Sequence, residues 1–174
     1  MLQETKSTSS NMDSLMSRLW HVSQSISLDS SRASGGLTIS WNPTEVDLDH
    51  FLASHHCITA LFHPIDTNFH GRITNVYGPH LPNQKSSFLN FLQWLFLVQA
   101  RPMDVLGGDF NLITSLQDKR GGRPMLTEED KLFKGFIDNS NLIDLHTNNG
   151  IHTLNNRRGK SAQIASKLDR FLIT

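Results

Sequence analysis

The sequence predicts a layered α/β protein in which two β-sheets pack together with helices outside. Two observations support this class. Short apolar and β-branched runs of strand length come in groups, and segments with a helical period separate these groups. The chain has 174 residues and balanced charge, which fits one soluble domain with a core of its own.

Four segments are predicted to be helical. The second covers residues 85–99, and the fourth is a short segment at 161–166. The third begins after Thr127, because the acidic residues that follow suit the positive end of a helix. The first has apolar residues near a 3.6-residue period after three candidate capping residues: Met12, Leu15, Met16, Leu19 and Ile26, after Ser9, Ser10 and Asn11.

Six runs rich in β-branched and aromatic residues are predicted to be strands. In one of them apolar and acidic residues alternate from Val46 to Asp49, so one of its faces should meet water. The six predicted strands are residues 36–41, 46–52, 57–63, 72–77, 103–108 and 168–173.

Composition excludes several classes of function. The net charge is zero at pH 7, so no global attraction draws the chain to nucleic acid or to a membrane surface. Segment 88–98 is apolar but too short to cross a bilayer. The single cysteine, Cys57, can form no internal disulfide, which favours an intracellular setting in the nucleus or cytoplasm rather than secretion.

Two local clusters of positive charge could still meet a polyanion. For each cluster taken alone, solvated loop charge is the simpler explanation. The clusters are Lys119, Arg120 and Arg123 around a Gly-Gly pair, and Arg157, Arg158 and Lys160 around Gly159.

The segment from Met103 to Asn111 is the most informative in the chain. An apolar strand ends in two glycines, followed by Asp109 and Asn111. In extended backbone these two side chains would project from the same face. A carboxylate can hold a proton or a metal, and a carboxamide can donate to a phosphate oxygen. A simple turn at the end of the strand explains the two residues equally well.

Four motifs in order resemble the endonuclease/exonuclease/phosphatase superfamily over nearly the whole chain. The nearest resemblance is to the endonuclease domain of plant LINE-type retrotransposons, which residues 118–122 and 155–158 also resemble. The motifs are Gln3-Glu4-Thr5-Lys6, Val76-Tyr77-Gly78-Pro79, Gly108-Asp109-Phe110-Asn111 and Ser166-Lys167-Leu168-Asp169-Arg170.

This resemblance implies a four-layered α/β sandwich that cleaves phosphodiesters, typically in DNA, with Mg²⁺ or Mn²⁺. Glu4 would hold the metal, and Asp109 would orient or deprotonate the attacking water. Asn111 and Tyr77 would donate hydrogen bonds to the phosphate, and Asp169 would orient a catalytic histidine. We expect Glu4, Tyr77, Asp109 and Asn111 to gather around one pocket.

The sequence departs from the family pattern in three places. It has no Ser-Asp-His motif to supply that histidine, nothing precedes Met1 to supply the usual first strand, and Leu154 stands where a tryptophan is usual. We therefore expect a monomeric, single partial domain over residues 1–174, clipped at both ends and feeble or inactive. The alternatives are a non-catalytic nucleic-acid-binding relic of the same fold, and a phosphatase of the same superfamily.

Overall fold

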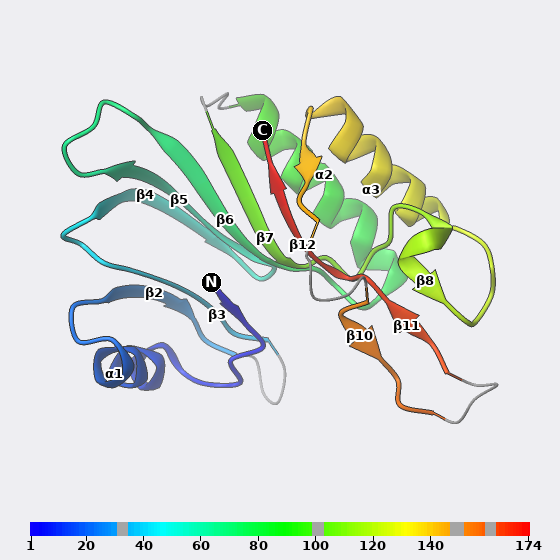
Figure 1. The fold of residues 1–174 in the computed structure, drawn as a ribbon, viewed down its shortest axis with the longest axis horizontal. Helices are drawn as coiled ribbons and strands as arrows, with labels where there is room; N and C mark the ends of the chain where they lie inside the picture. Colours follow the sequence, from blue (N-terminus) through cyan, green and yellow to red (C-terminus); the bar gives the residue numbers. More distant parts are fainter. Residues whose placement is uncertain (31–34, 99–102, 147–151, 159–162) are drawn as a thin grey trace. The chain divides into compact units, whose positions relative to one another are not determined.

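The computed structural model describes residues 1–30, 35–98, 103–146, 152–158 and 163–174 (Figure 1). The chain divides into two units, which are described separately. Unit 1 comprises Met1–Tyr77 with Arg101–Gly108, and unit 2 comprises Gly78–Ala100 with Asp109–Thr174. Helices and several sheets are both present, which confirms the predicted mixed α/β class.

Unit 1 is built as a helix on a sheet on a second sheet (Figure 1). Helix α1 (Ser9–Leu19) contacts the first sheet, whose strand order is β1-β3-β2. Strands β1 and β3 then pack on the second sheet, in which β4, β5, β6 and β7 are neighbours in that order. The strands are β1 (Leu2–Gln3), β2 (Gln24–Leu28), β3 (Leu37–Trp41), β4 (Val46–Ser54), β5 (Cys57–Pro64), β6 (Gly71–Tyr77) and β7 (Asp104–Asp109).

The core of unit 1 lies between its two sheets. Leu37 and Ile39 from β3 pack with Ile58 from β5 and Tyr77 from β6, and all four are buried. Strand β4 keeps the predicted alternation, since Val46 and Leu48 are half-buried while the two aspartates between and after them are exposed. The six predicted strands are confirmed as β3 to β7 and β12 (Asp169–Ile173).

The first helix is shorter than the sequence predicts. It ends at Leu19, and its cap is Thr8, whose hydroxyl accepts from the N–H of Asn11. Ile26, which was assigned to the helix, lies on β2 and pairs with Ile39. The reason is tertiary pairing: Ile26 is β-branched and packs against the core between the sheets, where a strand fits better than a further helical turn.

Unit 2 contains helices α2 (Pro82–Val98) and α3 (Glu128–Asn139), which pack against each other. Strand β12 pairs antiparallel with β9 (Ile143–Asp144). None of the described helices is long and apolar enough to cross a membrane. A three-stranded antiparallel sheet has the order β10 (Leu154–Asn155), β11 (Ala165–Ser166), β8 (Lys119–Arg120), and β8 follows the short 3₁₀ helix η1 (Leu116–Asp118).

The predicted start of the third helix is confirmed. The Thr127 hydroxyl accepts from the Asp130 N–H, and Asp130 Oδ2 accepts from the Thr127 N–H, so each satisfies a group that the helix end leaves unpaired. Asp130 Oδ1 also accepts from the N–H of Ile113 (3.0 Å), which ties this helix end to the loop after β7.

The fourth predicted helix is wrong where the structure describes it. Residues 161 and 162 lie outside the described residues, and Ala165–Ser166 form strand β11. Their backbones pair with β8 on one side and β10 on the other, and this non-local pairing outweighs a weak local preference for helix.

Candidate functional site

Glu4 and Tyr77 meet in unit 1. The Tyr77 hydroxyl donates to Glu4 Oε1 at 2.6 Å, across a sequence separation of 73 residues. Tyr77 ends β6 and is 7% exposed, whereas Glu4 is exposed just after β1. Glu4 has φ of +50°, a left-handed conformation that a non-glycine residue keeps only when its surroundings hold it. A buried phenol therefore holds an exposed carboxylate at a fixed point.

His56 supports Tyr77 from the neighbouring strand pair. The Tyr77 N–H donates to the His56 carbonyl at 2.8 Å, and His56 Nδ1 lies 3.0 Å from the Tyr77 carbonyl. A carbonyl only accepts, so Nδ1 carries the proton. Burial lowers the pKa of His56, which favours the neutral ring in this position.

Asp109 and Asn111 form one turn in unit 2. The prediction that they share a face of an extended strand is wrong, because Asn111 has φ of +52° and leaves the strand direction. Instead the Asn111 N–H donates to Asp109 Oδ1 at 2.8 Å, while Asn111 Nδ2 donates to the Gly78 carbonyl at 2.8 Å. Lys85 Nζ donates to the Asn111 carbonyl at 2.8 Å. Asparagine suits this left-handed position better than most residues.

Gly78 is required where it stands. A Cβ there would lie 2.3 Å from the Phe110 carbonyl oxygen, and the Gly78 N–H donates to the Asp109 carbonyl at 2.7 Å. Phe110 anchors the turn: its side chain is fully buried, its ring centroid lies 5.0 Å from that of the tilted Phe133 ring, and its N–H donates to the Leu168 carbonyl. The glycine and the aromatic residue of the two motifs thus fix the backbone of the turn that carries Asp109.

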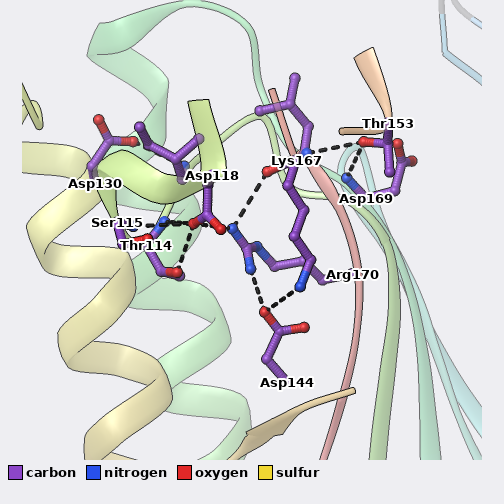
Figure 2. Close-up of polar contacts among 11 residues, drawn as sticks. Thr114, Ser115, Asp118, Asp130, Asp144, Thr153, Lys167, Asp169 and Arg170 are labelled. Carbon is purple, nitrogen blue, oxygen red and sulfur yellow. Dashed lines mark hydrogen bonds and ion pairs between the residues drawn. The ribbon is translucent and has the colours of Figure 1, made fainter. Parts of the chain in front are cut away.

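Asp169 is exposed at the start of β12 in unit 2. The N–H groups of Asp169 and Leu168 both donate to Thr153 Oγ1, at 3.1 and 3.0 Å (Figure 2). Among the described residues, Asp169 forms no ion pair with the neighbouring Arg170. Backbone hydrogen bonds, not charge, hold Asp169 in place.

Arg170 instead joins a buried network of charges in unit 2 that the sequence analysis missed (Figure 2). Its fully buried guanidinium donates to Asp118 Oδ2 at 2.7 Å and to Asp144 Oδ2. Lys167 Nζ lies 2.8 Å from the same Asp144 oxygen, and its side chain is 8% exposed. Arginine and lysine are rarely buried, so their residue types did not indicate burial. The only indication in the sequence was that Lys167 and Arg170 belong to the fourth motif.

Asp118 is the most heavily bonded carboxylate of that network. Its Oδ2 accepts from the N–H and hydroxyl of Thr114, the N–H of Ser115 and the Arg170 guanidinium. Burial raises the pKa of Asp118, but these hydrogen bonds and the Arg170 charge outweigh it and bring the pKa below its ordinary value. Asp118 is therefore ionised at neutral pH.

The carboxylate oxygens of Glu4 suit a hard cation better than a structural zinc ion. Among the described residues no three His, Cys, Asp or Glu side chains form a group that could hold a metal. Glu4 offers an exposed carboxylate of which Oε1 is bonded to Tyr77. Mg²⁺ is commonly held by one or two carboxylates, with water and substrate phosphate completing its shell.

The structure thus brings Glu4 to Tyr77 in unit 1 and Asp109 to Asn111 in unit 2. The gathering of all four around one pocket stays a prediction.

Known structures with the same fold include endonuclease/exonuclease/phosphatase proteins. A family protein from Bacteroides thetaiotaomicron gives a TM-score of 0.64 at 13% identity, covering 94% of this chain and 65% of its own. The endonuclease domain of TRAS1, a telomere-specific non-LTR retrotransposon, gives 0.63 at 13% identity, covering 86% and 67%. A mannosyl-6-phosphatase from Bacteroides thetaiotaomicron gives 0.64 at 15% identity, covering 99% and 69%.

These similarities establish the fold. No family model matches the sequence, and no curated protein matches it. The chain spans 65 to 69% of the length of the three neighbouring structures. The chain has the endonuclease/exonuclease/phosphatase fold, and its neighbours include both a nuclease and a phosphatase.

Proposed function

We propose that this chain is a metal-dependent DNA phosphodiesterase of retrotransposon origin. The observation that carries the proposal is the 2.6 Å hydrogen bond from Tyr77 to Glu4, because it joins two of the four motifs and holds an exposed carboxylate in place. The Asp109–Asn111 turn supports it from the third motif. A retrotransposon endonuclease domain among the structures of the same fold is consistent with this origin.

Each side chain has a role that its chemistry allows. Asp109 would orient or deprotonate the attacking water, since its carboxylate is half-buried and held by the turn. Asn111 has two amide protons and uses one on Gly78, so the other can donate to a phosphate oxygen. Asp169 would orient a catalytic histidine, as the family resemblance implies, but the sequence of this chain has no Ser-Asp-His motif to supply one.

Glu4 would hold Mg²⁺ or Mn²⁺, which would offset negative charge on the phosphoryl group and its leaving oxygen. Tyr77 has a single hydroxyl proton, and that proton is directed at Glu4. This geometry supports a role for Tyr77 in orienting the metal ligand, ahead of the direct phosphate contact that the family resemblance implies.

The first test is nicking of supercoiled plasmid DNA by the purified chain. We expect conversion to the open circle in Mg²⁺ or Mn²⁺ and no conversion in EDTA. The conversion should be slow, because the sequence has no Ser-Asp-His motif and loss of one member of a catalytic set costs orders of magnitude in rate. Glu4→Gln should raise the metal concentration needed for half-maximal rate. Agarose gels with time points over hours measure both.

Three outcomes would count against the proposal. Metal-independent nicking would remove the role of Glu4, and a folded protein that nicks nothing would favour a non-catalytic module. Release of inorganic phosphate from sugar monoesters without any nicking would favour the phosphatase alternative, which the mannosyl-6-phosphatase of the same fold keeps in view.

A DNA-binding role that does not require catalysis is favoured by a second observation. The small sheet of unit 2 places Arg120 on β8 opposite Ala165, and Ala165 opposite Asn155 on β10. Arg157 and Arg158 follow β10 and are exposed, as is Arg120. The two basic clusters therefore flank a single three-stranded sheet; Lys160 and Gly159 lie outside the described residues.

We expect duplex DNA to bind this unit through phosphate contacts, so that affinity falls as salt rises. Arg120→Gln and Arg157→Gln should each reduce the magnitude of the negative slope of log K against log salt by about 0.9. Lys134→Gln, on the exposed face of α3 and paired with Asp138, is the matched control and should leave the slope unchanged. Fluorescence anisotropy in Ca²⁺ measures the slope, and salt-independent binding would contradict the role.

A further inference from the structure

Asn75 is a fully buried amide whose hydrogen-bonding capacity is turned toward the N-terminal strand. It lies on β6 two residues before Tyr77, so the two side chains share a face of the strand. Its Nδ2 donates to the carbonyls of Leu2 and Thr38, both at 2.9 Å, and its Oδ1 accepts from Gln3 Nε2 at 2.5 Å. One side chain thus satisfies groups on both β1 and β3.

The two carbonyls that Asn75 bridges belong to residues that face each other. Leu2 is the register partner of Thr38 in the antiparallel pair of β1 with β3. A slip of β1 by one residue would turn Glu4 to the opposite face of the strand and break the two bonds that Asn75 makes to Leu2 and Gln3. Asn75 therefore specifies the register that places Glu4 next to Tyr77.

Strand β1 needs such support because it has two residues, with Glu4 directly after it in a left-handed conformation. A two-residue pairing has few hydrogen bonds to hold it, and unfavourable backbone conformations persist only where neighbours hold them. Backbone bonds from Thr5 and Lys6 to the carbonyls of Gly36 and Gly35, at 3.3 and 3.1 Å, hold the far side of Glu4. On the N-terminal side of Glu4, Asn75 holds the Leu2 carbonyl and the Gln3 side chain.

We infer that Asn75 is a positioning residue for the metal ligand Glu4. The inference rests on the proposed function, since Glu4 is a metal ligand only if that proposal holds. Asn75 acts through Gln3 and the backbone of β1, so its loss releases Glu4 from the Tyr77 hydroxyl without any change at either residue.

The chain reports on this directly because Tyr77 is its only tyrosine. Protein labelled with ¹³Cζ-tyrosine gives one NMR signal, and Glu4→Ala defines its position when the hydroxyl has lost the carboxylate. We expect Asn75→Leu, in metal-free protein, to move the Tyr77 signal most of the way to the Glu4→Ala position. Amide exchange at residues 3–6 should become at least about tenfold faster, as for a frayed strand.

Thr74→Val is the matched control. Thr74 is the neighbouring residue on β6, is also fully buried, and bonds the Thr59 hydroxyl at 3.0 Å on the opposite face of the strand. It should lower stability while leaving the Tyr77 signal and the exchange at residues 3–6 unchanged. An equal change in Thr74→Val would overturn the inference, and so would a wild-type signal in Asn75→Leu.

Two further measurements keep the outcomes distinct. If Asn75→Leu does not fold, Gln3→Leu removes only the bond to Asn75 Oδ1 and should move the signal in the same direction by less; no movement would overturn the inference. Broadening of the Tyr77 signal by Mn²⁺ should need about tenfold more metal in Asn75→Leu, as for loss of a residue that orients a ligand. A wild type that neither binds Mn²⁺ nor nicks DNA defeats the proposed function alone.

Discussion

Asp109→Asn should abolish most of the DNA cleavage while leaving the protein folded. The amide oxygen of asparagine can still accept from the Asn111 N–H, so the turn that holds residue 109 is kept. The substitution removes only the charge that would take a proton from water. A positioned general base contributes about 10²–10⁴-fold to a rate, so we expect a loss of that order in the plasmid-nicking rate.

Three measurements on the same preparation separate this expectation from a structural effect. The free energy of unfolding should change by less than about 1 kcal/mol, because no packing is lost. The Kd for duplex DNA in Ca²⁺ should stay the same or tighten. A nicking rate within tenfold of wild type would show that Asp109 serves the turn alone, which is the alternative that its sequence context also allows.

Arg170→Met should give the largest loss of stability. The substitution leaves two carboxylates, Asp118 and Asp144, in a buried site without the guanidinium that bonds both. Removing one partner of a buried ion pair typically costs about 3–5 kcal/mol, because an uncompensated charge remains. Urea unfolding at neutral pH measures it. Lys134→Met breaks an exposed pair on α3 and should cost less than about 1 kcal/mol.

The contribution of Asp118 to stability should depend on pH in a defined direction. The pKa of Asp118 is lowered in the folded protein from an ordinary value of 3.8, so its contribution is present above that value and is lost as the pH falls through the folded pKa. The difference in stability between wild type and Asp118→Asn should therefore be largest near neutral pH and shrink below pH 3.8. A difference that grows on acidification would contradict the network.

The long elements could be predicted because their signals are local. The runs at 57–63 and 72–77 are rich in β-branched residues and form β5 and β6. Thr127 and the acidic residues after it predicted the start of α3. The two-residue strands β8, β10 and β11 could not be predicted, since each exists only through its pairing with distant segments. Strand β2 was missed because Ser25 and Ser27 around Ile26 mask its β-character.

The candidate site could be predicted as residue types but not as contacts. The motifs pointed to Glu4 and Tyr77, yet nothing in the sequence says that the tyrosine proton is directed at the carboxylate. The supporting residues were missed for a physical reason: Asn75 and Arg170 belong to polar types that are usually exposed, so their burial depends on partners up to 73 residues away.

The location of Glu4 has a consequence for how the protein folds. The bonds that fix it join residues 2 to 4 with residues 75 to 77, and they close a loop of more than seventy residues. Closing so long a loop carries an entropic cost that only later contacts offset, so non-local pairings of this kind form slowly. The hairpin of β5 and β6 can assemble from neighbouring residues, and the N-terminal strand then docks on a finished platform. The Glu4 carboxylate would thus be among the last groups to reach its place during folding.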